Sequence, residues 1–270
     1  MKIKFNFIGL AILLFAGNLF GQDSLIHQTV FPKGISVDYG LGRYSVRDKY
    51  ISKNKYSGSI SSLNVTWSHF NKHRGVRLIF DYRSNSEIKN YNLSTRIKEF
   101  SFTGAYIYSI GTFNLFSKKV YTYLGPSWDF YLHARNQNMA SHMMATTLSY
   151  ATLISVGLNS EFICPIKPKL QVEGSLGLSL LSLAGRLPDL ETEEAKMIKL
   201  LPFYSAMKGY STVAFRYNFM KKLSCRMGYQ FRFIWFKSST RWGTEDGWYG
   251  LAVANDNIFL GLTWNIGGAE

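Results

Sequence analysis

The sequence predicts an all-β fold, an antiparallel up-and-down transmembrane β-barrel of ten strands. Three observations lead to it: two-residue alternation along many segments, apolar faces rich in aromatic residues, and an export signal. In the segment 257–266, one face consists of Ile258, Leu260, Leu262, Trp264 and Ile266. Period two indicates a strand. The opposite faces combine charged or amide residues with glycine, which suits a narrow polar interior, whereas the large apolar faces suit lipid.

The N-terminus predicts export. Lys2 and Lys4 precede a mainly apolar run at 5–15, and small residues follow up to Gly21. A basic start, a short apolar run and small residues form a secretory signal peptide. The run is shorter than the ~20 residues of a membrane-spanning helix. We therefore predict a signal peptide at 1–21 and one outer-membrane β-barrel domain at 22–270.

Composition agrees with strands that face lipid. The chain is 46% hydrophobic and 16% aromatic, yet its mean hydropathy is −0.06. The formal net charge is +14, and loss of Lys2 and Lys4 with the signal peptide leaves 14 − 2 = +12. For an exported protein this charge favours anionic lipid, including lipopolysaccharide, over nucleic acid as a partner.

The predicted strands alternate between short and long connections. The ten strands are expected at 34–46, 58–70, 75–84, 95–110, 119–135, 148–164, 170–184, 209–220, 223–235 and 257–266. Short turns are expected at 71–74, 111–118, 165–169 and 221–222, with longer loops between the other strands. Outer-membrane barrels have short periplasmic turns and long extracellular loops, so an even strand count places both ends of the barrel on the periplasmic side.

This pattern resembles the small outer-membrane β-barrel proteins of Gram-negative bacteria. The resemblance covers the mature chain as a pattern, and the final alternating strand, with Leu260, Leu262 and Trp264, is its closest approach to a motif. It implies location in the outer membrane and contact with the barrel-insertion machinery during biogenesis. Because members include adhesion proteins, narrow channels and a few enzymes, the family alone does not fix a function.

The sequence contains no convincing catalytic arrangement. Omptin proteases, which are ten-stranded, use paired acids and an Asp–His pair, but the inward residue two positions after Asp81 is Arg83. Asp129 and His133 would lie ~13 Å apart along a strand, too far for a hydrogen bond. We predict no enzyme, no metal site and no cofactor. Cys164 and Cys225 are interpreted as lipid-facing thiols rather than a disulfide.

Inward charges near the periplasmic end predict a layer of ion pairs. The candidate residues are Glu161, Glu173, Arg216, Arg226 and Arg77. Charges in a narrow lumen must be paired or hydrated. The first interpretation is a structural or surface-interaction barrel with a mostly filled lumen. The alternatives are a narrow channel for small solutes or ions, in which these charges line the water path, and, third, an omptin-like or lipid-modifying enzyme.

Two long loops stand out, one that could cover the barrel mouth or pack on its rim and one that could bind an unidentified surface ligand or protein. The segment 189–201, between Pro188 and Pro202, is predicted as a short amphipathic helix. The loop after the ninth strand carries three aromatic residues among glycines, namely Trp242, Trp248 and Tyr249. Exposed aromatic side chains suit a binding surface, and the favoured alternative is that they extend the aromatic belt of the barrel.

Overall fold

The computed structural model describes residues 31–48, 55–85, 88–90, 93–138, 146–187, 197–236 and 250–266. The strands are β1 (Lys33–Asp48), β2 (Lys55–Phe70), β3 (Arg74–Ser84), β4 (Ile88–Asn90), β5 (Leu93–Leu115), β6 (Lys118–Asn138), β7 (Thr146–Lys167), β8 (Leu170–Leu187), β9 (Met197–Pro202), β10 (Ala206–Asn218), β11 (Leu223–Phe236) and β12 (Leu251–Asn265). Among these residues, no helix is long and apolar enough to span a membrane. The predicted signal peptide lies outside the described residues.

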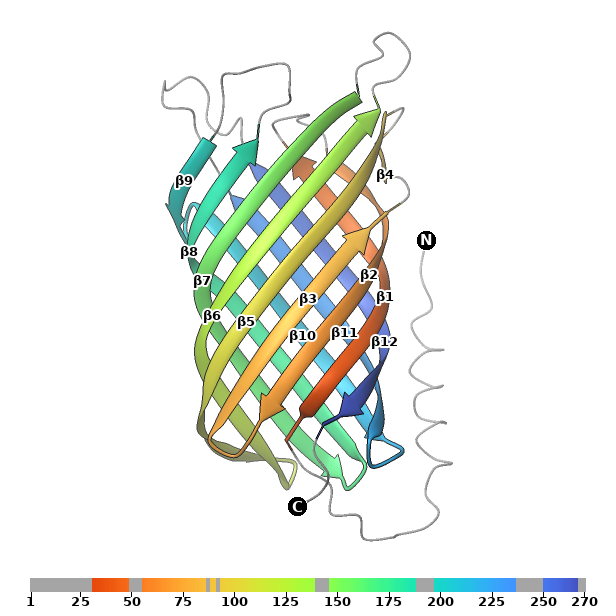
Figure 1. The fold of residues 1–270 in the computed structure, drawn as a ribbon, viewed down its shortest axis with the longest axis vertical. Helices are drawn as coiled ribbons and strands as arrows, with labels where there is room; N and C mark the ends of the chain where they lie inside the picture. Colours follow the sequence, from red (N-terminus) through yellow and green to blue (C-terminus); the bar gives the residue numbers. More distant parts are fainter. Residues whose placement is uncertain are drawn as a thin grey trace.

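Ten strands close into an antiparallel barrel (Figure 1). The order around the barrel is β1-β12-β11-β10-β8-β7-β6-β5-β3-β2, and β2 pairs again with β1. At the seam, β1 and β12 pair without a shift from Gly34↔Asn265 to Asp48↔Leu251. The short strand β4 pairs with β2 and β5, and β9 pairs with β8. The predicted fold and the count of ten strands are confirmed.

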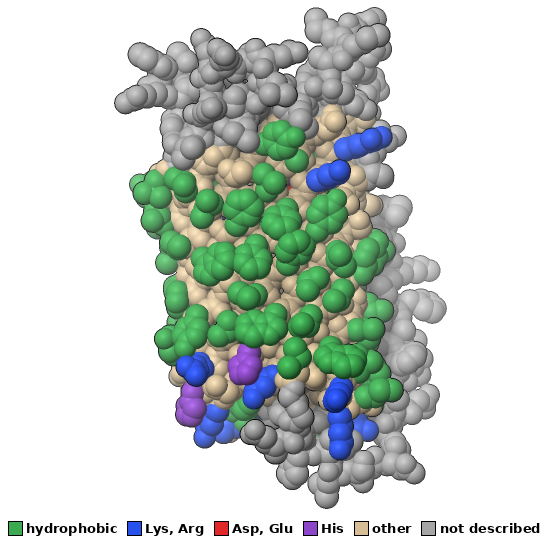
Figure 2. Space-filling model, in the orientation of Figure 1, with side chains coloured by type: hydrophobic (Ala, Val, Ile, Leu, Met, Phe, Trp, Pro, Cys, Tyr) green, Lys and Arg blue, Asp and Glu red, His purple; other side chains and the backbone are tan. Residues whose placement is uncertain are grey.

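The outer face carries the apolar residues that the alternation assigned to it. Along β12, the exposed fractions of Ile258, Leu260, Leu262 and Trp264 lie between 52% and 60%, while Thr263 is fully buried. Figure 2 shows hydrophobic side chains spread as a belt around the visible face of the barrel. In water such a surface would be an unusually large apolar patch, whereas in a bilayer it is solvated by lipid. Cys164 and Cys225 are free and half-buried.

One predicted turn is wrong in length. The sequence suggested a connection at 111–118, but β5 and β6 continue to Leu115 and Lys118, which leaves only Phe116 and Ser117 between them. Both residues have positive φ, 48° and 64°, as the twist-matched two-residue hairpin turn requires. The register between β5 and β6 shifts between Ser109 and Gly111, and Gly111 has a φ of 141°.

The predicted helix at 189–201 also needs correction, because its C-terminal part is the strand β9. β8 continues to Leu187, but its pairing with β10 ends at Leu178. β9 pairs with the part of β8 that lies nearer the long loops, from Leu181↔Pro202 to Arg186↔Met197. The backbone groups of β8 that β10 leaves unpaired thus gain partners, and this need outweighs the local helical pattern.

Candidate functional site: the filled lumen

Six charged side chains meet in the lumen above the short turns, and we call them the lower charge layer. They are Arg77, Arg216, Arg226, Asp38, Glu161 and Glu173. Their exposed fractions lie between 1% and 6%. Arg216 on β10 pairs with Glu173 on the neighbouring β8 at 3.0 Å. Arg226 on β11 pairs with Asp38 on β1 at 2.6 Å and lies 3.8 Å from Glu173.

The remaining ion pair of this layer is supported by hydrogen bonds from neutral side chains. Arg77 on β3 pairs with Glu161 on β7 at 2.7 Å. The second carboxylate oxygen of Glu161 accepts a hydrogen bond from the Asn159 side-chain amide at 3.0 Å. Tyr210 in turn donates its hydroxyl hydrogen to the Asn159 oxygen at 2.9 Å. Both oxygens of the buried Glu161 carboxylate therefore have donors.

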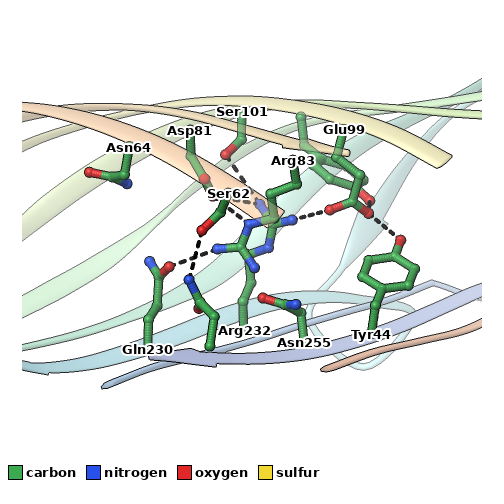
Figure 3. A network of polar contacts seen from close by, with 12 residues as sticks. Tyr44, Ser62, Asn64, Asp81, Arg83, Glu99, Ser101, Gln230, Arg232 and Asn255 are labelled. Carbon is green, nitrogen blue, oxygen red and sulfur yellow. Dashed lines mark hydrogen bonds and ion pairs between the residues drawn. The ribbon is translucent and has the colours of Figure 1, made fainter. Parts of the chain in front are cut away.

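A second set of six charges lies nearer the long loops, and we call it the upper charge layer. It consists of Arg83, Lys208, Arg232, Asp81, Glu99 and Asp129. Arg232 reaches from β11 to Asp81 at 3.2 Å and to Glu99, which lie on β3 and β5 (Figure 3). Arg83 pairs with Asp81 at 2.9 Å and donates to the Gln230 side-chain oxygen at 2.7 Å. This layer crosses the lumen.

Glu99 is the most heavily bonded acid of the upper charge layer. Beyond Arg232, its carboxylate accepts hydrogen bonds from the hydroxyls of Tyr44 and Tyr131, the latter at 2.5 Å. His133 Nδ1 lies 3.2 Å from the same Glu99 oxygen. Four side chains from three strands, β1, β6 and β11, thus surround one carboxylate and enclose it.

Asp129 and His133, the pair considered for catalysis, have different partners. Asp129 pairs with Lys208 at 2.7 Å and accepts a hydrogen bond from Thr103. His133 is fully buried beside Glu99. The structure does not bring Asp129 and His133 together as an acid–base pair. Within the described residues, no cluster of three or more His, Cys, Asp and Glu side chains could hold a metal ion.

Charge is balanced within each layer. Each layer contains three cations and three carboxylates, and the histidine beside Glu99 is not counted among them. Burying an unpaired charge costs several kcal/mol, whereas a paired and hydrogen-bonded charge offsets much of that cost. Balanced layers let the lumen hold these twelve charged side chains without a column of water to hydrate them. A further buried cation, Arg135, lies outside both layers, donates to the Thr95 hydroxyl at 3.1 Å and lies over the Tyr56 ring.

Apolar side chains fill the lumen at both ends, whereas the sequence predicts a polar interior throughout. At the periplasmic end the lower apolar cluster consists of Phe70, Ala105, Ile107, Tyr123 and Ile163. Near the long loops the upper apolar cluster consists of Tyr44, Val46, Tyr56, Ile60, Ile88, Ile97, Tyr131, Ala151, Leu153, Ala184, Leu201, Ala206, Ile234, Phe236, Leu251 and Val253. The inward positions near the ends of the strands are thus apolar, as in the core of a soluble protein.

Two small cavities lie between these side chains. One cavity of about 20 Å³ lies beside Asp38, Arg77 and Arg226, and another of similar volume lies near Gln171 and Arg216 at the periplasmic end. A cavity of this size holds about one water molecule.

The five residues predicted as an ion-pair layer are all in the lower charge layer, where the structure joins them to Asp38. The upper charge layer was not predicted. Its acid Glu99 could have been found from the sequence, since it alternates with the outward Phe100 and Phe102. The loop residues Trp242, Trp248 and Tyr249 lie outside the described residues.

No protein-family model and no curated protein matches the sequence. Among solved structures, the outer-membrane protease OmpT from Escherichia coli shares 8% identity at a TM-score of 0.48, over 87% of this chain and 97% of OmpT. The translocator domain of the autotransporter NalP from Neisseria meningitidis shares 9% at 0.46, over 96% and 95%. Neisserial surface protein A shares 14% at 0.37, over 87% and 98%. At these identities and TM-scores the likeness says nothing of activity.

Proposed function

We propose that this protein, a small outer-membrane β-barrel, is a non-conducting scaffold that presents its extracellular loops at the cell surface. Its membrane location follows from the closed antiparallel barrel and the apolar outer face. The proposal rests on one observation, the filling of the lumen by two charge-balanced layers between two apolar clusters.

The size of the barrel supports this proposal. Eight strands give an interior that side chains can fill, and ten strands give one only slightly wider. Here arginine side chains span that extra width, as Arg232 does between β11 and β5. A hydrated ion would have to displace bonded side chains in both layers and then pass sixteen apolar residues.

Recording from purified protein in planar bilayers tests the proposal. We expect no steady conductance steps, with a general porin in the same bilayers as the positive control for insertion. Uniform steps that change in size in an Arg232→Ala variant would show that ions cross the lumen and would establish the channel alternative. Steps that Arg232→Ala leaves unchanged would indicate a contaminant.

The proposal also assigns no catalytic role. Asp129 and His133 are engaged by Lys208 and Glu99, which favours a structural role for both. We expect no peptide or lipid hydrolysis by the purified protein. Hydrolysis that is lost in Asp129→Asn or His133→Ala, but kept in the outward-facing control Asp256→Asn, would overturn this assignment. The loops, including Trp242, Trp248 and Tyr249, are then the surface for a partner.

A further inference from the structure

The periplasmic end of the barrel carries a ring of basic residues. Each of the four short connections and the start of β1 contribute, and we call the set the basic ring: Lys33, Lys72, Arg74, Lys118, Lys119, Lys167, Lys169, Lys221 and Lys222. Seven of the nine are exposed, and Lys33 and Lys169 are half-buried. Figure 2 shows blue and purple side chains gathered directly below the hydrophobic belt.

No exposed acid offsets this ring among the residues that the structure describes. The acids nearest to it, Asp38, Glu161 and Glu173, point into the lumen and are at most 3% exposed. Asp48 and Asp256 lie in the halves of β1 and β12 that face the long loops. Since the charges of the two layers cancel one another, the ring gives this end a net positive field among the described residues.

The basic ring begins where the apolar belt ends. Arg74 is paired in register with Tyr108, whose side chain is 55% exposed, and donates to the Tyr106 hydroxyl at 3.4 Å. On the other side of the barrel, the Lys222 backbone carbonyl accepts a hydrogen bond from the backbone amide of Asn265. The preceding residue, Trp264, is 56% exposed. Exposed aromatic side chains mark the membrane interface, which places the cations at the depth of the lipid phosphates.

We propose that the basic ring binds anionic phospholipid headgroups of the inner, periplasmic leaflet. The connections that carry it join β2 to β3, β5 to β6, β7 to β8 and β10 to β11, and so they are distributed around the whole barrel. Such an annulus matches lipids, which surround the barrel, better than a protein, which would contact one side. Lysine and arginine suit phosphate as charged hydrogen-bond donors.

Native mass spectrometry of protein released from micelles that contain equal amounts of phosphatidylglycerol and phosphatidylethanolamine tests the proposal. We expect the wild-type chain to retain several-fold more phosphatidylglycerol, and this preference to fall as salt is raised before release, because screening weakens exposed ion pairs. Equal retention of the two lipids by the wild-type chain would overturn the proposal, and would leave an acidic periplasmic protein as the better partner.

Variants locate the effect. The six-residue variant K72Q/R74Q/K118Q/K119Q/K221Q/K222Q is expected to lose most of the preference, and the hairpin variant K118Q/K119Q part of it. A matched control, R43Q/R96Q/K98Q, removes exposed cations near the long loops and should keep the preference. Heat-dependent gel mobility checks that each barrel is folded. If the folded hairpin and six-residue variants both retain phosphatidylglycerol as the wild type does, the ring is not the binding surface.

Discussion

The two charge layers of the lumen differ in the distance that their ion pairs span. In the lower charge layer, Arg216 and Glu173 are on neighbouring strands, and Arg226 and Asp38 are separated only by β12. In the upper charge layer, Arg232 on β11 meets Glu99 on β5, with β12, β1, β2 and β3 between them on one side and β10, β8, β7 and β6 on the other. Those two strands lie on opposite walls.

The difference indicates two structural roles. In the lower layer, Arg216–Glu173 joins neighbouring strands, the two pairs of Arg226 each bridge one intervening strand, and Arg77–Glu161 bridges two, so these pairs fasten strands that lie close together on one wall. The Arg232–Glu99 pair connects walls that share no backbone hydrogen bonds, and so it helps to fix the cross-section of the barrel. We therefore expect the barrel to be more sensitive to changes in the upper layer.

The largest effect is expected for Glu99→Gln. The variant leaves Arg232 without its principal carboxylate and removes the charge that Tyr44, Tyr131 and His133 surround. Breaking a buried ion pair from one side destabilises a protein by about 3–5 kcal/mol. Urea unfolding in detergent micelles, followed by tryptophan fluorescence, measures the loss of free energy of unfolding.

Asp256→Asn is the matched control, because it exchanges an acid for its amide on the outer face of β12, and it should change stability by less than about 0.5 kcal/mol. A loss below about 1 kcal/mol for Glu99→Gln would contradict the role of the upper layer. It would mean that Asp81 alone suffices for Arg232.

The same contrast explains which parts of the site the sequence predicts. Alternation assigns each residue to the inner or outer face, and the order of strands places Glu173 beside Arg216, so this pair of the lower layer follows from neighbouring strands. The pairing of Arg232 with Glu99 depends on the diameter and stagger of the closed barrel. Neither quantity is encoded in local residue patterns.

Bulges limit the prediction in another way. In β8 the register shifts so that Ser179 faces Gly157 while Leu181 faces Val156, and both Leu180 and Leu181 are exposed. A strict two-residue alternation would send Leu181 into the lumen. An inserted residue of this kind depends on how the strands pair, which local alternation does not reveal. One additional residue reverses the faces of all the residues that follow it in the strand.

A smaller loss is expected for Asp38→Asn in the lower layer. Arg226 loses its 2.6 Å partner but retains Glu173 at 3.8 Å, so the cation stays partly compensated. We expect a decrease of about 1–3 kcal/mol in the free energy of unfolding, measured as for Glu99→Gln. A loss as large as that of Glu99→Gln would show that the two layers do not differ in importance.

The smallest effect is expected for Tyr210→Phe, and its comparison with Tyr131→Phe again separates the layers. Tyr210→Phe removes a hydrogen bond to the neutral Asn159 and should cost about 0.5–1.5 kcal/mol, whereas Tyr131→Phe removes one to the carboxylate of Glu99 and should cost about 1.5–3 kcal/mol. Tyr229→Phe, on the outer face, is the control with little expected effect. Equal losses for Tyr131→Phe and Tyr210→Phe would argue against a special position of Glu99.

The seam between β1 and β12 has a consequence for the order of assembly. Ser36 and Thr263 share a hydrogen bond of 2.8 Å across 227 positions of the chain, and Asp38 meets Arg226 across 188. The Ser36–Thr263 contact cannot form before the last strand, β12, has been made, so the edge of β1 that pairs with β12 stays open throughout synthesis. If β12 then joined one residue out of register, its inward and outward side chains would exchange faces. Large apolar side chains such as Trp264 would enter the lumen, so the seam favours closure in a single register.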